Sequence, residues 1–264
     1  MQLIEIINSI EKIAPLAAAA SWDRSGLQVA ARREDVAALA VCLDPTPSSV
    51  RNALELGAEC ILSHHPLLLT PVLPTRLDDY HEVLRLLLVA DVPLYAAHTS
   101  LDVNGRGPAG WLAQELELRN LAVLEPTSGQ PFGDTLPLGF GLAGDLPSPL
   151  GFEAIVEILA RHLDLSTAAL CGPTPGTIRR LAYCTGSGSS LLPAARAAGA
   201  DLFITGDVKY HTALAAEIST LDVGHHSLEE EMMRRMCRLL QERLEPLEIF
   251  FVPSRSPLRP LVVS

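Results

Sequence analysis

The chain of 264 residues has little positive charge for its length. It contains 20 Lys and Arg against 31 Asp and Glu, so its formal net charge is −11. Proteins that bind nucleic acid neutralise phosphates with clustered Lys and Arg, and this balance therefore argues against a nucleic-acid partner. An acidic chain is compatible with cation binding, although acidity alone does not establish it.

Long apolar runs and paired cysteines are also missing. No uncharged apolar stretch approaches the roughly 18 residues of a membrane span, so no membrane partner is expected. The five cysteines form no C-x-x-C pair, and we expect buried, reduced thiols. The opening "MQLIEIINSIEKIAPL" has no basic leader, and its apolar spacing predicts an amphipathic helix. Together these absences predict a cytoplasmic protein.

The sequence contains a repeated unit. Segment 39–66 aligns without gaps with segment 181–208, at an offset of 142 residues. "LAVC" matches "LAYC", and "ECILS" matches "DLFIT". Each copy predicts a strand, a turn rich in Gly, Pro or Ser, a helix that ends at glycine, and a second strand. This is a βαβ unit, whose strands have parallel neighbours.

A second pair of matching segments follows in the same order. "AAHTSLD" (96–102) resembles "VGHHSLE" (223–229), at an offset of 127 residues. In both, a short apolar strand ends in His-x-Ser-Leu followed by an acid. Two matches in the same order indicate an internal duplication, so we predict an α/β fold of two similar halves.

The arrangement of the repeats predicts where the two halves begin and end. Between the copies, segment 125–151 is rich in Gly and Pro and predicts turns with short strands. The last helix, about 228–243, and the strand in "EIFFVPS" follow the second copy and are expected to return to the first half. We therefore predict a first half of residues 1–124 and 223–264, and a second half of residues 125–222. We expect mixed sheets with flanking helices in both halves.

Polar side chains gather where the predicted strands end. The clusters after four strands are His64 and His65; His98 and Asp102; Gly206 and Asp207; and His225, His226 and Glu229. Ligands of open α/β folds bind at this carboxyl edge. Imidazole and carboxylate are ligands for Zn, Mn, Fe, Co or Ni, and no cysteine joins the clusters. A single histidine at a strand end is usually a surface group, but four such clusters on duplicated units predict a metal site.

The spacing within these clusters suits metal binding. His225 and Glu229 are four residues apart, so they share a face if a helix begins there. His64 and His65 would point to opposite faces of a regular strand. Each can then serve one ion, while a carboxylate bridges the two.

The motifs resemble those of a known family. Seven stretches occur in the family's order and cover nearly the whole chain: "WDRSGLQV", "CLDPT", "ILSHHPLLL", "AAHTSLDV", "AYCTGSGSS", "ADLFITGDVKYH" and "GHHSLEEE". They resemble the dinuclear-metal-centre proteins related to NGG-one-interacting factor three, some of which carry the label GTP cyclohydrolase I type 2. One departure is that Arg24 and Ser25 replace the family's Asn-containing turn before Gly26.

The resemblance implies a site, a cofactor and an assembly. It implies a fold of two intertwined α/β halves and a toroidal homohexamer, with two divalent transition-metal ions per chain. The implied ligands are His64, His65, Asp102, His225 and Glu229, and Glu229 would bridge the ions. His98 is the candidate catalytic proton carrier, although the duplication also allows it to be a ligand like His225.

A dinuclear centre predicts hydrolysis, because two ions lower the pKa of a bound water and polarise a substrate oxygen. Chemistry like that of GTP cyclohydrolase would add water at the purine C8 and open the ring, with a nucleotide as the small-molecule substrate. The sequence has no P-loop, since "CTGSGSS" (184–190) lacks a following Gly-Lys-Ser/Thr. Its glycines could approach an anion or could form only a strand-to-helix turn.

The alternative function is a non-catalytic metal-binding hexamer that handles ions or acts as an interaction or chaperone-like protein. Its ligand requirements are the same as those of the enzyme. A base that is not itself a ligand would favour the enzyme, and His98 and His211 are the candidates.

The duplication also predicts a role for Asp207. This residue aligns with His65, so both should follow equivalent strands. We expect Asp207 to orient a ligand imidazole through a hydrogen bond, because such partners hold the rings of metal-binding histidines.

Overall fold

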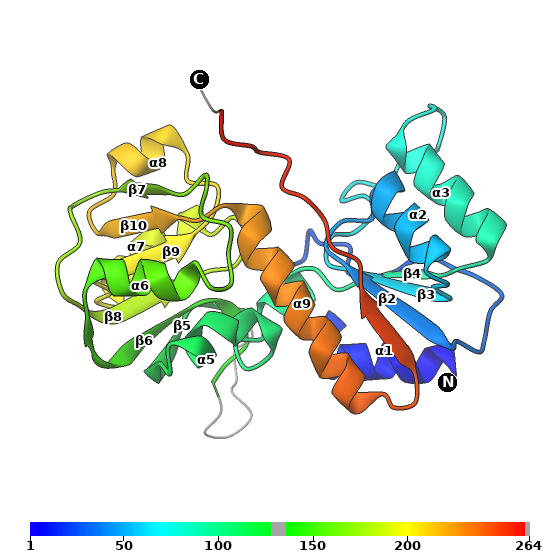
Figure 1. Cartoon of the computed structure of the whole chain (residues 1–264), viewed down its shortest axis with the longest axis horizontal. Coiled ribbons are helices and arrows are strands. Elements are labelled where there is room, and N and C mark those ends of the chain that lie inside the picture. Colours follow the sequence, from blue (N-terminus) through cyan, green and yellow to red (C-terminus); the bar gives the residue numbers. More distant parts are fainter. Residues whose placement is uncertain (128–135, 262–264) are drawn as a thin grey trace. The chain divides into compact units, whose positions relative to one another are not determined.

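The chain forms two compact units in the computed structural model, which describes residues 1–127 and 136–261. Unit 1 comprises Met1–Leu101 and Met233–Ser254, and unit 2 comprises Asp102–Met232 and Arg255–Ser264. Each unit is an α/β structure with one mixed sheet and flanking helices, which confirms the predicted fold class (Figure 1).

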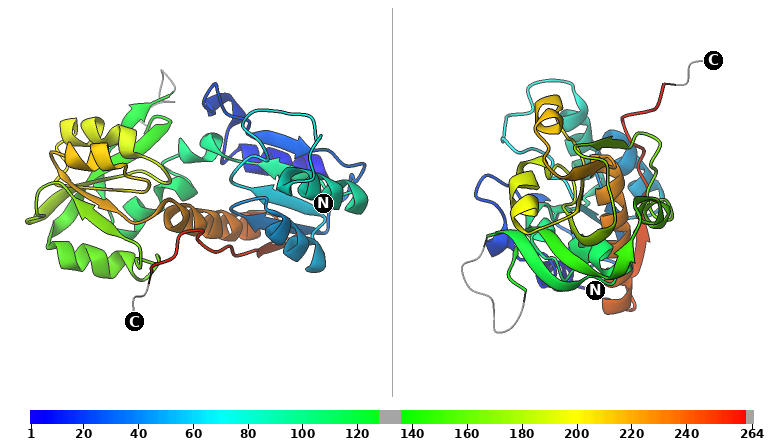
Figure 2. Two further views of the ribbon diagram at one scale, coloured as in Figure 1. Left: turned by 90° about the horizontal axis from the view of Figure 1, so that it is seen from above. Right: turned by 90° about the vertical axis from the view of Figure 1, so that its left-hand side faces the viewer.

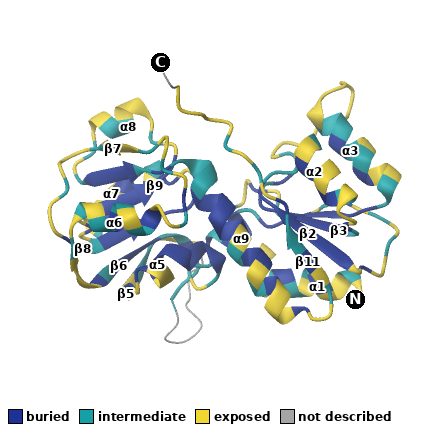
Figure 3. Cartoon of the chain, viewed as in Figure 1, coloured by how far each residue is buried: buried dark blue, intermediate teal, exposed yellow. Residues whose placement is uncertain are grey.

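Unit 1 contains a five-stranded sheet in the order β1-β4-β3-β2-β11. The strands are β1 (Gly26–Val29), β2 (Ala38–Cys42), β3 (Cys60–Ser63), β4 (Leu94–Ala96) and β11 (Glu248–Phe251). Strands β11, β2, β3 and β4 are parallel, and β1 pairs with β4 in the antiparallel sense. Strands β2 and β3 are buried at every residue (Figure 3), which is typical of parallel strands covered on both faces.

The helices of unit 1 cover this sheet. They are α1 (Leu3–Glu11), the 3-10 helix η1 (Leu16–Ala18), α2 (Pro47–Glu55) and α3 (Asp79–Ala90). Helix α1 occurs where the apolar spacing predicted it, and it buries Ile6 and Ile10. Helices α2 and α3 pack Val50 and Leu87 into one core with Ile61 of β3. In Figure 1 these two helices lie on one side of the sheet and α1 lies on the other.

Unit 2 contains a six-stranded sheet in the order β5-β6-β8-β9-β10-β7. Its strands are β5 (Arg119–Pro126), β6 (Gly139–Leu150), β7 (Ala169–Cys171), β8 (Ile178–Tyr183), β9 (Leu202–Thr205) and β10 (Ser219–Asp222). Strands β8, β9 and β10 are parallel. Because β5 pairs with β6, residues 102–124 belong to unit 2, whereas the sequence assigned them to the first half. Residues 223–232 also belong to unit 2.

The helices of unit 2 are short. They are η2 (Pro108–Gly110), α5 (Trp111–Glu115), α6 (Phe152–Leu159), η3 (Ser189–Leu191), α7 (Leu192–Ala197) and α8 (Tyr210–Leu214). Figure 2 shows α6 and α7 on opposite faces of the sheet. Helix α7 buries Ala195 against Ala182 of β8 and Phe203 of β9.

Two helices contain residues of both units. Helix α4 (Thr99–Asp102) ends with the first residue of unit 2, and α9 (His225–Arg243) begins in unit 2 and ends in unit 1. The sequence predicted the start of this last helix near residue 228, and it begins three residues earlier. None of the helices that the structure describes is both long and apolar enough to cross a membrane.

The pairing of the strands supports the internal duplication. In unit 1, Leu39 pairs with Cys60 in the parallel ladder of β2 and β3. In unit 2, Leu181 pairs with Leu202 in the ladder of β8 and β9. Both partners are displaced by the same 142 residues, so the two βαβ units have the same register.

The segment between the copies forms a longer strand than predicted. Turns with short strands were expected over 125–151, but β6 extends for 12 residues and pairs with both β5 and β8. Its glycines allow neighbouring strands to approach closely, since a Cβ on Gly139 would lie 2.3 Å from the carbonyl oxygen of Glu125. Glycine therefore serves strand packing here. Part of the predicted segment, residues 128–135, lies outside the described residues.

Candidate metal centre

Unit 1 brings three histidines together just beyond the ends of two parallel strands. Strand β3 ends at Ser63, directly before His64 and His65, and β4 ends two residues before His98. One ligand nitrogen from each of the three rings lies within 4.8 Å of the others. His64 is fully buried, whereas His65 and His98 are partly exposed. These rings could hold one metal ion.

His64 and His65 do not point to opposite faces, so that prediction was wrong. The regular strand has already ended, because the backbone N–H groups of both residues donate to the carbonyl of Leu43 at 3.1 Å. Their ring centroids lie only 4.9 Å apart. The centroid of His98 lies 5.2 Å from that of His64 and 5.4 Å from that of His65. The alternation of a pleated strand does not extend beyond Ser63.

Unit 2 brings the other three predicted ligands to the loop that follows β8. Since α9 begins at His225, Glu229 lies one turn further on the same face, and its carboxylate is 2.8 Å from Nε2 of His225. A Cβ on Gly186 would lie 2.1 Å from the carboxylate of Glu229 and 3.2 Å from Nε2 of His225. Asp102 borders the same loop, because its carboxylate accepts a hydrogen bond from the hydroxyl of Thr185 at 3.3 Å.

Glycine at position 186 is required for this arrangement. Its φ of +59° lies in the left-handed region, and any side chain would occupy the place of the Glu229 carboxylate. A backbone hydrogen bond fixes this loop, since the N–H of Gly206 donates to the carbonyl of Gly186 at 2.9 Å. The sequence left open whether the glycines of "CTGSGSS" approach an anion or form a turn. The close packing of Gly186 against the Glu229 carboxylate explains the glycine at this position.

Four histidines of the two units are anchored through the same ring nitrogen. The Nδ1 contacts are His64 to the carbonyl of Ala97 at 2.8 Å, His65 to Asp44 at 2.7 Å, His98 to Asp23 at 2.7 Å, and His225 to Asp207 at 2.7 Å. Carbonyl and carboxylate oxygens accept, so Nδ1 is the donor in each ring and Nε2 is the atom suited to bind a metal. Metal-binding histidines almost always have such a second hydrogen bond. The donor set is nitrogen and oxygen only, and it fits divalent transition metals.

Comparison with known proteins identifies the chain. The family model described as Duf34/NIF3 (NGG1p interacting factor 3) matches residues 1–257. The chain belongs to this family. This confirms the resemblance that the sequence motifs indicated.

Relatives of this Duf34/NIF3 chain match it over nearly their full length. The chain is 29% identical to a "GTP cyclohydrolase 1 type 2 homolog" of Clostridium perfringens, with 98% of each chain covered. It is 30% identical to "NIF3-like protein 1" of Drosophila melanogaster, with 95% of this chain and 86% of that protein covered. The crystal structure of a hypothetical protein of Staphylococcus aureus matches with a TM-score of 0.86 at 25% identity, covering 99% of both chains.

The hydrogen-bond partner that the duplication predicted in this Duf34/NIF3 chain is present. Asp207 accepts from Nδ1 of His225, a ring of the same unit. The corresponding partners of His65 and His98, Asp44 and Asp23, had been given no role. Asp44 follows β2, so the rule that polar residues gather at strand ends could have found it. Asp23 lies in the loop before β1, away from any strand end, and only the family motif "WDRSGLQV" could have pointed to it.

Asp23 is the centre of a dense group of hydrogen bonds. Its carboxylate accepts from Nδ1 of His98, the N–H of Arg24, the hydroxyl of Ser25, and both the N–H and the hydroxyl of Thr99. Burial by itself would raise the pKa of Asp23, but the hydrogen bonds from His98, Ser25 and Thr99 hold that pKa well below its usual range. Asp23 therefore stays ionised and fixes both the position and the protonated nitrogen of His98.

Two carboxylates surround His225 in the metal-free protein. Burial by itself lowers the pKa of His225, but hydrogen bonds and charge from Glu229 and Asp207 outweigh burial and raise that pKa to about 9. The ring is thus protonated near neutral pH in the absence of metal. A metal ion would take the place of the proton at Nε2, as expected of a ligand histidine beside a carboxylate.

Other candidate residues of the Duf34/NIF3 chain lie elsewhere. His226 is turned toward Glu230, at 4.0 Å. His211 is exposed on α8, with its ring against Tyr210, so it is a poor candidate for the base. The thiol of Cys184 donates to the carbonyl of Thr185, and burial raises its pKa. This thiol is therefore not a ready thiolate ligand.

Proposed function

We propose that this member of the Duf34/NIF3 family is a metal-dependent hydrolase with a dinuclear centre. His64, His65, Asp102, His225 and Glu229 would hold the two divalent transition-metal ions. The observation that carries the proposal is the set of imidazoles whose Nδ1 atoms are held by oxygen acceptors, which directs Nε2 toward a metal.

The pair of ions, when bound, would supply an activated water and would polarise the substrate. The protein supplies a proton carrier, His98. Its Nδ1 is held by the ionised carboxylate of Asp23, so Nε2 is the atom that takes up and returns the proton. The same carboxylate stabilises the imidazolium that forms. His98 is 13% exposed, so its ring has limited access to solvent.

The names of the relatives support a nucleotide substrate, since several are called GTP cyclohydrolase 1 type 2 homologs. In that reaction water adds at C8 of the purine and the five-membered ring then opens. We expect protein loaded with metal to convert GTP, or another heterocycle in a metabolite extract, to a product one water heavier. Chromatography with mass spectrometry would detect it, and protein treated with a chelator is the control. If protein with two bound ions converted neither GTP nor any metabolite of the extract, the result would contradict the hydrolase and favour the non-catalytic metal-binding function.

The role of His98 can be separated from that of a ligand. We expect His98→Gln to keep both ions and to lose turnover, because glutamine removes the proton carrier and leaves the five ligands in place. Elemental analysis beside an activity assay would show this. Loss of an ion from the variant would instead assign His98 as a ligand, which its position beside His64 and His65 also allows.

We also propose that the chain assembles as a cytoplasmic homohexamer, on the basis of its motifs and its family. Light scattering at micromolar concentration should give about six times the chain mass of 28.3 kDa. A monomer under these conditions would contradict the proposed assembly without affecting the ligand assignment.

A further inference from the structure

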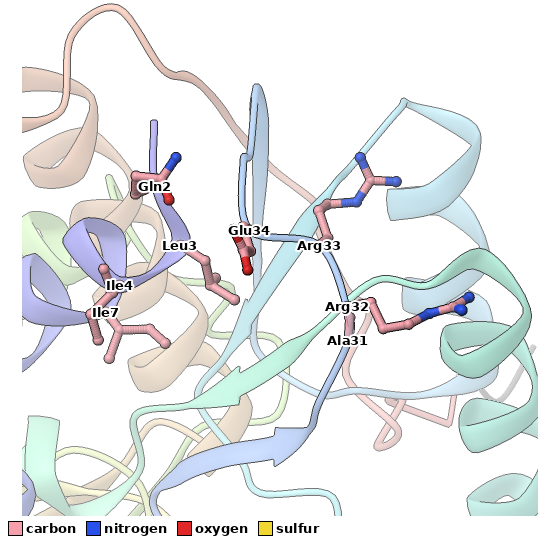
Figure 4. A pocket seen from close by; sticks show the side chains of 8 residues that line it. All are labelled: Gln2, Leu3, Ile4, Ile7, Ala31, Arg32, Arg33 and Glu34. Carbon is pink, nitrogen blue, oxygen red and sulfur yellow. The ribbon is translucent and has the colours of Figure 1, made fainter.

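Two of the pockets formed by described residues of unit 1 differ in what they offer a ligand. The larger, about 670 Å³, lies between α1 and residues 31–34 (Figure 4). Figure 4 shows Arg32 and Arg33 extending away from the apolar side chains of α1. Arg33 lies 2.8 Å from Glu59, and Arg32 lies 3.7 Å from Asp91. Both arginines thus have a carboxylate neighbour and extend away from the apolar side of this pocket.

The second pocket, about 400 Å³, lies beside the candidate proton carrier. It is formed by the turn at residues 23–28, the loop at residues 67–71, and Tyr80. Asp23, which lines it, binds Nδ1 of His98. The loop begins two residues after His65. The groove thus borders the hydrogen-bond acceptor of His98, and one of its walls follows His65 in the chain.

The walls of the groove are fixed by side-chain hydrogen bonds. The amide nitrogen of Gln28 donates to the carbonyl of Arg24 at 2.6 Å, and the amide oxygen of Gln28 accepts from the N–H of Leu67 at 3.1 Å. Gln28 therefore joins the turn to the loop. The hydroxyl of Tyr80 donates to the carbonyl of Val72 at 3.3 Å and holds the far end of the loop. A groove whose walls are already in place loses little entropy when a ligand binds.

The groove combines an apolar wall with a positive charge. The wall is made by Leu27, Leu67, Leu68, Pro71 and Tyr80. The charge is that of Arg24, which is exposed and donates from Nη1 to the carbonyl of Asp23 at 3.3 Å. Among the residues that the structure describes, no carboxylate forms an ion pair with Arg24. The carboxylate of Asp23 is engaged by five hydrogen bonds, and within the described part of the chain the guanidinium of Arg24 contacts only the backbone carbonyl of that residue, so it stays available to an anion.

We propose that this groove binds the substrate through Arg24, and that the substrate is a small molecule with a phosphate or carboxylate group joined to a flat aromatic ring. The guanidinium fork of Arg24 matches the two oxygens of such an anion. The wall from Leu27 to Tyr80 covers the ring. The inference rests on the proposed function, because it names the substrate class of the same metal centre. It also gives a purpose to Arg24, one of the two positions where the chain departs from the family motif.

The test uses full-length protein, both loaded with metal and depleted of it, and four probes that share one ring. Phenyl phosphate and phenylacetate carry the anion, benzylamine carries a cation, and benzyl alcohol is neutral. Trp22 is a local reporter, since it is 58% exposed and its ring lies 5.8 Å from that of His98. Fluorescence titration, checked by ligand-observed NMR, should show saturable binding of at least one anionic probe. Benzylamine and benzyl alcohol should bind far more weakly.

Arg24→Ala should lower the affinity for the anionic probe by about tenfold or more, because it removes a charged hydrogen-bond donor. The same loss is expected in the metal-depleted protein. Arg161→Ala is the matched control, because it removes the same charge from an exposed residue of unit 2. Leu27→Ala should lower the affinity for phenyl phosphate but not the affinity for inorganic phosphate. A preference for phenyl phosphate would identify a phosphate ester as the substrate, and a preference for phenylacetate would identify a carboxylic acid.

Several results would contradict the proposal that this groove binds an anionic substrate. They are no binding of any anionic probe, equal binding of benzylamine, or unchanged binding to Arg24→Ala. Metal analysis of the same samples keeps the two proposals apart. Binding that depends on Arg24 in a protein that never takes up metal would contradict only the proposed function. Two bound ions with no binding that depends on Arg24 would contradict only the groove.

Discussion

The carboxylate of Asp207 lies 2.7 Å from Nδ1 of His225, and Asp207 occupies the position that His65 occupies in the first copy of the repeat. The two copies therefore use one strand-end position in different ways. The first places an imidazole there, and the second places an acceptor that holds an imidazole from α9. The preceding position differs between the copies as well. A Cβ on Gly206, the counterpart of His64, would lie 2.4 Å from the backbone nitrogen of His225, so no histidine fits there.

Substitution of Asp207 and of Glu229 should have different effects on metal binding. Asp207→Asn keeps the shape of the side chain but loses the charge that orients His225, so we expect both ions to bind with about 10- to 100-fold lower affinity. Glu229→Ala removes a ligand and should empty at least one position. Competition with a chromophoric chelator would measure both affinities. Unchanged affinity and activity in Asp207→Asn would contradict the role of this hydrogen bond and leave the five ligands unaffected.

Gly186→Ala should disturb the metal centre without substituting a proposed ligand. The added Cβ would lie 2.1 Å from the carboxylate of Glu229, so that side chain must move. We expect the variant to lose at least one ion, as measured by elemental analysis. Gly199→Ala is the matched control, because Gly199 also has a positive φ, of +76°, but has open space around its Cβ position. Normal metal content in both variants would show that Glu229 is not held by this loop.

Metal binding should release a proton from His225. In the metal-free protein the pKa of His225 is raised to about 9, so the ring carries a proton at neutral pH that a metal must displace. Affinity should rise with pH up to about 9 and then level off, with about one proton released from this ring near pH 7.5. Calorimetry in two buffers of different ionisation enthalpy counts the protons. In Asp207→Asn, which lacks one of the two carboxylates, the rise should end at lower pH. No proton release in the unaltered protein would refute this account.

Asp23→Asn should destabilise unit 1 as well as release His98. The amide cannot accept all the hydrogen bonds that the carboxylate accepts, and we expect a loss of about 2–3 kcal/mol in the free energy of unfolding. The folded-state pKa of Asp23 is depressed, so its contribution is complete above the unfolded pKa of about 4 and is lost as pH falls below it. Urea unfolding from pH 7 down to pH 3 should show the gap between variant and wild type narrowing. Asp79→Asn, at an exposed position in the first turn of α3, is the control and should change stability little.

Much of the fold could be predicted from local patterns. The helical spacing of the first residues predicted α1, and the ungapped repeat predicted two βαβ units whose ladders have the same register. Local patterns did not predict the structure where a residue distant in the sequence determines the conformation. β6 could not be predicted as a long strand, because its glycines signal turns unless a close neighbouring strand explains them.

The sequence by itself determined which residue types stand at the ends of which strands. It placed imidazoles and carboxylates at the ends of the duplicated strands, because the start and end of a strand can be recognised from the pattern of residues that are adjacent in the sequence. Only the tertiary structure decided which nitrogen of each ring is held and by what. Asp23 lies 75 residues from His98, and Asp44 lies 21 residues from His65. A hydrogen bond requires atoms within about 3 Å and a suitable angle. Between residues so far apart in the chain, packing of the sheet and its loops sets that geometry, and no local pattern records it.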